Sequence, residues 1–284
     1  HAMPNVPAKG LHLATAFISR SALRNNAKLA ASIAGSNALL CMVKANAYGH
    51  GIVETALTLN DLCWGFGVAR CSEGAVLRDA GIDKPIVVMS DYSIQYDIDT
   101  IRHYRLTPTL YCEKHAAKIA QIYRDNHQPY WLKINTGMHR LGLNTIESAD
   151  LATHAEVIAT HLHSSGEVDR RPTELQLEKF VQSLSRFDQQ TTRADNDNDL
   201  ANQGEQPMLS FANSAALLYQ SSCANYKRWK AESLGNIAKS HNEIVRPGIM
   251  LYGANPLAEA NDATAKLCAA MTCLLYTSDA ADES

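Results

Sequence analysis

The stretch ALLCMVKANAYGHG, residues 38–51, joins two features that together point to the fold. Its first six residues form an apolar run, which is typical of a strand that is buried on both faces of a sheet. Lys44 follows directly, and after it come small residues, a tyrosine and two glycines. An isolated lysine after a strand is usually a solvated loop charge. In this setting we take Lys44 as a candidate functional residue instead, because a cation at the end of a buried strand is costly unless it is paired or used.

The same kind of short apolar run recurs along the chain. Each run is separated from the next by a segment that is able to form a helix. The eight runs are 38–43, 64–69, 85–90, 107–111, 130–135, 156–163, 208–212 and 243–247. Alternating strands and helices indicate βα units around a parallel sheet, and eight units predict an α/β fold of the (β/α)8 TIM-barrel type.

Several of the intervening segments carry helix signals. Residues 72–80 have Ser72 as a candidate cap and Gly81 just beyond, and residues 172–187 have a proline near their start. These signals predict helices over both segments. Residues 146–154 leave room for a short helix. The segment 188–207 is polar and almost free of large apolar residues, so we expect a flexible excursion on the barrel surface.

Composition excludes several classes of function. The 284 residues include 26 Lys+Arg and 29 Asp+Glu, so the chain offers no basic field for nucleic acid or an anionic membrane surface. No apolar run approaches the roughly 20 residues of a membrane span. The seven cysteines show no C-x-x-C spacing, and no apolar leader precedes them, which favours reduced thiols in the cytoplasm. We expect a small-molecule partner and predict no metal site.

Catalytic groups of such barrels lie at the carboxyl ends of the strands, and phosphates are often held after strands seven and eight. The candidates at these places are Lys44, Arg140, His161, Asn213, Ser214, Arg246, Gly248 and Ile249. Asn213 and Ser214 start a helix whose free N–H groups could face a phosphate, and Gly248 allows close approach of the backbone. A central lysine with a phosphate cradle suggests an imine-forming phosphate cofactor, of which pyridoxal 5'-phosphate is the obvious candidate.

Each candidate also has a structural interpretation. Arg246 could merely close a barrel loop, and Tyr48 could be a packing residue. His161 and His163 alternate along a strand, so one of them could belong to the core; we favour His161 as the functional one. Lys133 alternates with apolar neighbours in a predicted strand, where a buried ammonium needs a partner, and simple structural pairing remains open.

Six segments resemble the barrel domain of alanine racemases. In chain order they are VKANAYGHG, FGVARCSEGAVLR, LKINTGMHRLG, THLHSSGEVD, FANSAALL and VRPGIMLYG, and the resemblance covers roughly residues 12–256. It implies a pyridoxal-phosphate-dependent isomerase that interconverts L- and D-alanine for peptidoglycan precursors. It also implies an amino-acid substrate and a homodimer.

The resemblance implies roles for the catalytic candidates. Lys44 would carry the cofactor as a Schiff base and then act as a base on one face of the α-carbon. Tyr48 would donate its hydroxyl to the phosphate. Arg246 would meet the pyridine nitrogen, where a permanent cation disfavours ring protonation and favours simple reprotonation of the carbanion.

The remaining candidates would hold the cofactor and the substrate. Arg140 would position the substrate carboxylate and the cofactor's phenolic oxygen. Lys133 matches a family position that is often carbamylated, which would give an anion to brace Arg140. His161 would contact the cofactor ring, and the phosphate would be held by Asn213, Ser214, Gly248 and Ile249.

The sequence departs from the family pattern towards its end. We expect a tag remnant and N-terminal extension over residues 1–11, the barrel over 12–256, and the truncated start of a β-domain with a non-native tail over 257–284. In the family, that β-domain supplies a tyrosine to the partner's site as the second base, and no residue here can be assigned that role. We therefore expect cofactor binding with slow or absent racemisation, since a positioned acid or base contributes about 10²- to 10⁴-fold, and we expect doubtful dimerisation.

Two other readings stay open. A single-barrel pyridoxal-phosphate carrier or regulator without turnover matches the chain in size, although its motifs match racemases better. A decarboxylase-like barrel shares the broad architecture but normally requires a β-domain and a different second base. The racemase, the carrier and the decarboxylase can be distinguished by incubating the protein with L-alanine, L-ornithine or L-lysine and measuring the D-isomer and CO2.

Overall fold

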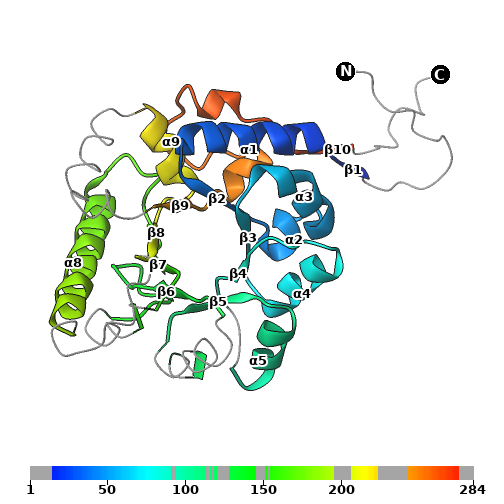
Figure 1. Ribbon diagram of the computed structural model, residues 1–284. Coiled ribbons are helices and arrows are strands. Elements are labelled where there is room, and N and C mark those ends of the chain that lie inside the picture. Colours follow the sequence, from blue (N-terminus) through cyan, green and yellow to red (C-terminus); the bar gives the residue numbers. More distant parts are fainter. Residues whose placement is uncertain are drawn as a thin grey trace, which may run out of the picture.

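The computed structural model has an eight-stranded parallel sheet that curls into a barrel (Figure 1). It describes residues 15–90, 94–112, 116, 118–119, 128–144, 151–152, 154–194, 206–222 and 242–274. The sheet order is β8-β7-β6-β5-β4-β3-β2-β9. Its strands are β2 (Ala38–Met42), β3 (Gly65–Val68), β4 (Ile86–Val88), β5 (Thr107–Leu110), β6 (Trp131–Lys133), β7 (Val157–Ala159), β8 (Met208–Ser210) and β9 (Ile244–Val245). Each strand falls within one of the eight apolar runs, so the predicted TIM-type barrel is confirmed.

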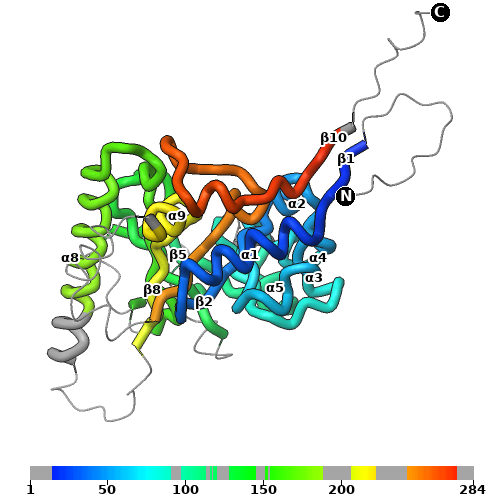
Figure 2. Tube along the Cα trace, turned by 90° about the horizontal axis from the view of Figure 1, so that it is seen from above, coloured from blue at the N-terminus to red at the C-terminus, as the bar shows by residue number. Residues whose placement is uncertain are grey.

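Helices surround the barrel on its outer side (Figures 1 and 2). They are α1 (Arg20–Ala34), α3 (Ile52–Leu59), α4 (Cys71–Asp79), α5 (Ile94–His103), α8 (Arg171–Ala194) and α9 (Ser214–Ser222). Short 3-10 helices lie at η1 (Asn60–Leu62), η2 (Ile249–Tyr252) and η3 (Thr264–Lys266). The start of α1 is capped by Ser19, whose hydroxyl accepts the N–H of Ala22 at 3.2 Å.

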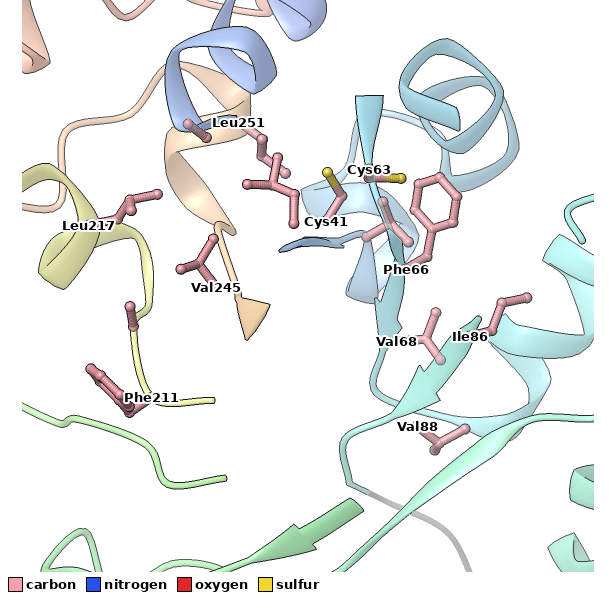
Figure 3. Packing of buried hydrophobic residues seen from close by; sticks show 14 of the residues in the cluster. Cys41, Cys63, Phe66, Val68, Ile86, Val88, Phe211, Leu217, Val245 and Leu251 are labelled. Atoms are coloured by element: carbon pink, nitrogen blue, oxygen red, sulfur yellow. The ribbon is translucent and has the colours of Figure 1, made fainter. Parts of the chain in front are cut away.

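Alternate residues of each strand enter two separate cores, as the period of a strand requires. Phe66, Ile86 and Val88 of the strands lie in the layer between sheet and helices, where Leu217 of α9 and Leu251 of η2 also pack (Figure 3). A smaller cluster fills the inside of the barrel; it comprises Leu40, Met42, Val87, Trp131, Val157, Ala159 and Ile244.

Part of the inner cluster lies toward the amino-terminal ends of the strands. Trp131 is the first residue of β6 and is fully buried, and Trp64 just before β3 lies with its ring centroid 6.4 Å from that of Trp131. The two indoles therefore fill one end of the barrel. The opposite end, where the strands finish, is left for polar side chains.

The structure corrects two helix predictions. α4 begins at Cys71 after the cap position Arg70, so Ser72 lies inside the helix and is not its cap. α8 continues to Ala194, so the expectation of a flexible excursion is wrong for residues 188–194. Polar residues are compatible with an exposed helix when few of them are strong helix breakers. Residues 195–205 and most of the short helix expected at 146–154 lie outside the described residues.

A two-stranded antiparallel ribbon extends away from the barrel (Figures 1 and 2). It pairs β1 (Thr15–Ile18) with β10 (Met271–Leu274), and Thr15 lies opposite Leu274. Leu274 is the last residue of β10, and residues 1–14 and 275–284 lie outside the described residues. In the described part of the chain, no helix combines the length and the apolar character that a membrane span needs.

Candidate active site

A cavity of about 700 Å³ lies at the carboxyl ends of the barrel strands. All ten residues predicted for the site line it: Lys44, Tyr48, Lys133, Arg140, His161, Asn213, Ser214, Arg246, Gly248 and Ile249. They come from loops that are up to about 200 residues apart in sequence and meet because parallel strands end on one face. The wall of the cavity also contains apolar and aromatic side chains, those of Met42, Met89 and Tyr111.

Lys44 enters the cavity from a left-handed turn of the backbone. In α2 (Lys44–Tyr48), the residues Ala45, Asn46, Ala47 and Tyr48 have φ values of 52°, 53°, 56° and 53°. This is one turn of left-handed helix, which costs L-residues roughly 1–2 kcal/mol each. Because Lys44 and Tyr48 are four positions apart, slightly more than one full turn, both can face the same cavity.

Three contacts hold this turn in place. Ala47 donates its N–H to the carbonyl of Val43 at 2.8 Å. The side-chain oxygen of Asn46 accepts the N–H of Ile52 at 2.9 Å and so ties the turn to the start of α3. Glu73, on α4, accepts the N–H of Ala45 at 2.7 Å. The sequence interpretation did not single out Asn46 or Glu73; the signal for Glu73 was its place three residues after the helix cap.

Positive charge dominates the cavity wall. Lys44, Lys133, Arg140 and Arg246 line it, and no aspartate or glutamate is among its described lining residues. Burial lowers the pKa of Lys44, with a further decrease from Arg140. Burial and then the charge of Arg246 lower the pKa of Lys133 to about 8. A site of this kind favours an anionic ligand that supplies the missing negative charge.

Arg246 is both buried and hydrogen-bonded. Its guanidinium donates to the carbonyl and the hydroxyl of Ser210 at 2.9 and 2.7 Å, and to the carbonyl of Thr160 at 2.6 Å. Burial lowers its pKa to about 10, which leaves it a cation at neutral pH. The side chain therefore links the ends of β7 and β8 to β9 while it faces the cavity.

The two alternating histidines differ in environment. His161 lines the cavity, and burial, followed by the charge of Arg246, lowers its pKa to about 3. His161 is therefore neutral at physiological pH. His163 is exposed, with its ring nitrogen 2.5 Å from the hydroxyl of Ser164. The structure thus places the favoured histidine in the cavity and the other one at the surface.

The loop before α9 and the loop after β9 form a cradle around Ser214. The Ser214 hydroxyl accepts the N–H of Gly248 at 2.8 Å. Asn213 caps α9, since its side-chain oxygen accepts the N–H of Ala216 at 3.0 Å. Its amide nitrogen also donates to the carbonyl of Leu162 at 3.1 Å. The side-chain oxygen of Asn213 therefore caps α9, and its amide nitrogen ties the helix start to the loop after β7.

Gly248 is required by the close approach of Tyr48. A Cβ atom at Gly248 would lie 2.5 Å from the Tyr48 hydroxyl oxygen, well inside van der Waals contact. This hydroxyl is thus held at the backbone of the cradle, beside the start of α9. Burial raises the pKa of Tyr48, so the group stays a neutral hydrogen-bond donor.

Comparisons with known proteins agree with this geometry. The model of the alanine racemase N-terminal domain matches residues 18–256. The alanine racemase of Pectobacterium carotovorum is 33% identical over 249 residues, which are 86% of this chain and 60% of the relative. The biosynthetic alanine racemase of Escherichia coli is 32% identical over 251 residues, or 87% of this chain and 61% of the relative. The chain thus spans about three fifths of these curated relatives.

A solved structure shows the same fold. The alanine racemase of Acinetobacter baumannii superposes with a TM-score of 0.72 at 26% identity, covering 93% of this chain and 70% of that one. The family match extends over most of the residues that build the barrel and the cavity. The chain therefore belongs to the family of alanine racemase N-terminal domains.

Proposed function

We propose that this chain is the cofactor-binding barrel of a pyridoxal-phosphate-dependent alanine racemase, an isomerase that interconverts L- and D-alanine. The observation that carries the proposal is the cavity itself. A lysine on a rigid turn, three further cations and a helix start converge there with no carboxylate among the described lining residues. The family of the chain and its named relatives support alanine as the substrate.

The residues of the cavity fit pyridoxal 5'-phosphate. The Tyr48 hydroxyl lies against the backbone at Gly248, beside the start of α9, and these groups would hold the phosphate. Ile249 contributes backbone to the same wall. When bound through the Lys44 amine, the cofactor would supply the electron sink that acidifies the Cα–H bond of an amino acid.

Lys44 is the proposed base for one face of the α-carbon. Its lowered pKa favours the neutral amine, which is the form that attacks an aldehyde carbon and accepts a proton. Arg246, a fixed cation held by Ser210 and Thr160, would keep a neighbouring ring nitrogen unprotonated. That environment favours return of the proton to the α-carbon over other outcomes.

The remaining polar groups would orient the cofactor and the substrate. Arg140 would bind the substrate carboxylate, and neutral His161 would contact the cofactor ring. Lys133 is the proposed site of carbamylation, because a pKa of about 8 leaves a fraction of free amine at neutral pH. An intact mass that rises by one CO2 under bicarbonate in the native protein, and not in Lys133→Met, is the expected result; an unchanged mass opposes it.

Lys44→Ala tests the proposal. The wild-type protein, incubated with pyridoxal phosphate and reduced with borohydride, should carry the cofactor mass on the peptide that contains Lys44. Lys44→Ala should not, whereas Lys28→Ala, a change at an exposed lysine of α1, should behave as the wild type. Adduct formation in Lys44→Ala would contradict the assignment.

Proton exchange tests the reaction separately from full turnover. In D2O, the protein with cofactor should replace the Cα hydrogen of one alanine enantiomer by deuterium through Lys44, even where the other enantiomer forms slowly. Release of CO2 from ornithine or lysine would favour a decarboxylase instead. Adduct formation without any exchange would favour a carrier.

The cellular setting completes the proposal. We place the enzyme in the cytoplasm as a homodimer that supplies D-alanine for cell-wall precursors. The free thiols of the six cysteines that the structure describes fit a reducing compartment. Sedimentation of the purified chain at several concentrations tests the dimer.

A further inference from the structure

Glu73 joins the loops that follow two neighbouring strands of the barrel. One carboxylate oxygen accepts the N–H of Ala45, beyond β2, at 2.7 Å. The other accepts the N–H groups of Ala69 and Arg70, beyond β3, at 2.7 and 3.2 Å. An ionised carboxylate that accepts three backbone donors makes hydrogen bonds that are stronger than neutral ones. The side chain comes from α4 and is not among the residues that line the cavity.

The contact with Ala45 acts on Lys44 through the backbone. The N–H of Ala45 belongs to the peptide group that directly follows Lys44, so its direction sets how the lysine leaves the turn. Ala45 is also the first of four successive non-glycine residues with positive φ. Such a turn in residues other than glycine is strained and persists only when its surroundings determine it. Glu73 is one of those determinants.

We propose that Glu73 is the positioning residue of Lys44, and that its carboxylate locks the left-handed turn so that the amine is presented to the cofactor. This inference rests on the proposed function, in which Lys44 carries pyridoxal phosphate. Glu73 also caps α4, so a purely structural role in that helix is the rival explanation. The two explanations differ in what happens at Lys44 when the carboxylate is altered.

The effect of the Glu73 charge on the pKa of Lys44 supports the proposal, which itself rests on the hydrogen bonds of Glu73. Burial, Arg140 and Arg246 all lower the pKa of Lys44, whereas the charge of Glu73 raises it. The carboxylate thus moderates the loss of proton affinity that burial imposes on the amine. Its removal should move the pH midpoint of adduct formation downward, a change that a helix cap alone does not produce.

Glu73→Gln is the principal test. The glutamine keeps the shape but replaces one acceptor oxygen by an N–H donor that faces a backbone N–H. We expect covalent attachment of pyridoxal phosphate to Lys44 to slow by about 10- to 100-fold, with its pH midpoint shifted down. The matched control is Glu174→Gln, the same change in the first turn of α8, which should alter the attachment rate by less than about twofold.

A second substitution separates positioning from helix capping. Ala45→Gly removes the strain of positive φ, since glycine adopts this conformation readily. In the Glu73→Gln background it should restore at least part of the attachment rate, because the turn then forms without the carboxylate. A Glu73→Gln protein with a lower melting temperature but an attachment rate and pH midpoint equal to those of the wild type would overturn the proposal. Failure of Ala45→Gly to restore any attachment would also overturn it.

Hydrogen exchange distinguishes failure of this inference from failure of the proposed function. If the wild-type chain formed no adduct at Lys44, the proposed function would fail. The amide of Ala45 can still be followed by NMR without cofactor. Faster exchange at Ala45 in Glu73→Gln, and not in Glu174→Gln, supports the lock; unchanged exchange refutes it.

Discussion

At Gly248 the wall of the cavity leaves no room for a side chain. A methyl group there would meet the Tyr48 hydroxyl at 2.5 Å, so Gly248→Ala must displace either the tyrosine or the cradle. Overpacking of this kind costs about 1–3 kcal/mol of folding free energy. We expect Gly248→Ala to weaken pyridoxal phosphate binding at least about tenfold, which calorimetric titration measures.

Tyr48→Phe supplies the control for this clash. The phenylalanine lacks the hydroxyl, so Gly248→Ala should lower the melting temperature less in the Tyr48→Phe background than in the wild type. Equal losses in both backgrounds would show that the hydroxyl is not what excludes the methyl group.

Lys133 imposes a pH dependence on stability. Its folded pKa is about 8 against an ordinary value of 10.5, so the unfolded chain binds more protons between these two values. Stability should therefore increase as the pH rises from 8 to 10.5, and the full cost of burying the ammonium applies below pH 8. We expect Lys133→Met to stabilise the protein by about 1–3 kcal/mol at pH 7 and to remove this pH dependence.

Urea denaturation of the cofactor-free protein at pH 7 and pH 10 measures the effect. Lys179→Met, at an exposed position of α8, serves as the control and should change neither value by more than about 0.5 kcal/mol. A Lys133→Met protein that is less stable than the wild type at pH 7 would mean that the ammonium has a stabilising partner.

At the scale of single elements, Asn26 binds α1 to η2 and to the segment after η3. Its side chain is fully buried, donates to the carbonyls of Leu251 and Cys268 at 3.0 and 2.8 Å, and accepts the N–H of Cys268 at 2.9 Å. Removal of the side chain takes the partner from one buried and two part-buried backbone groups. Asn26→Ala should cost about 2–4 kcal/mol in urea denaturation.

Asn25 is the neighbouring control on the same helix. It is exposed and donates to the carbonyl of Lys266 at 3.2 Å. Asn25→Ala should cost less than about 1 kcal/mol. Similar losses for both variants would show that the buried network of Asn26 adds nothing beyond a surface contact.

The sequence predicted the eight strands, but it did not predict the left-handed turn of α2 or the end of α8. The eight strands were predicted because each is a short apolar run, and such a run has few alternatives in a buried parallel sheet. The left-handed turn of α2 was not predicted. Alanine and tyrosine have no local preference for positive φ, and one partner that determines the turn, Glu73, lies 28 residues further along the chain. The end of α8 was missed because polar composition alone does not separate a helix from a loop.

On the scale of the whole molecule, the barrel closes at the seam between β8 and β9. The Ser210 hydroxyl donates to the carbonyl of Ile244 at 2.5 Å and accepts from Arg246 at 2.7 Å. Isolated bridges pair Leu209 with Glu243 and Asn213 with Arg246 on either side of it. Ser210→Ala should therefore lower both the melting temperature and the affinity for pyridoxal phosphate, since it loosens the seam and releases Arg246.

Ser183→Ala is the matched control for the seam. Ser183 is equally buried, but its hydroxyl donates within α8 to the carbonyl of Lys179 at 2.7 Å. It should lower the melting temperature with no change in cofactor affinity. An unchanged affinity in Ser210→Ala would show that Arg246 keeps its place without the serine.

The gathering of the ten predicted residues around one cavity followed from topology, because all of them come at or after the carboxyl end of a barrel strand. The sequence did not predict the hydrogen-bond partners or the protonation states of these side chains. The second contact of Asn213, with the carbonyl of Leu162, depends on a loop 51 residues away in the sequence. The lowered pKa of His161 likewise depends on burial and on charges from elsewhere in the chain.

The pair of indoles at the far end of the barrel has a consequence for how ligands would enter and leave the cavity. Trp64 and Trp131 pack with the cluster that fills the inside of the barrel, so among the described residues a ligand in the cavity would pass on the side where the strands end. In the proposed racemisation, departing product and arriving substrate would then use the same opening in turn. Slow departure of one alanine enantiomer would therefore delay the arrival of the other, however fast the chemistry inside.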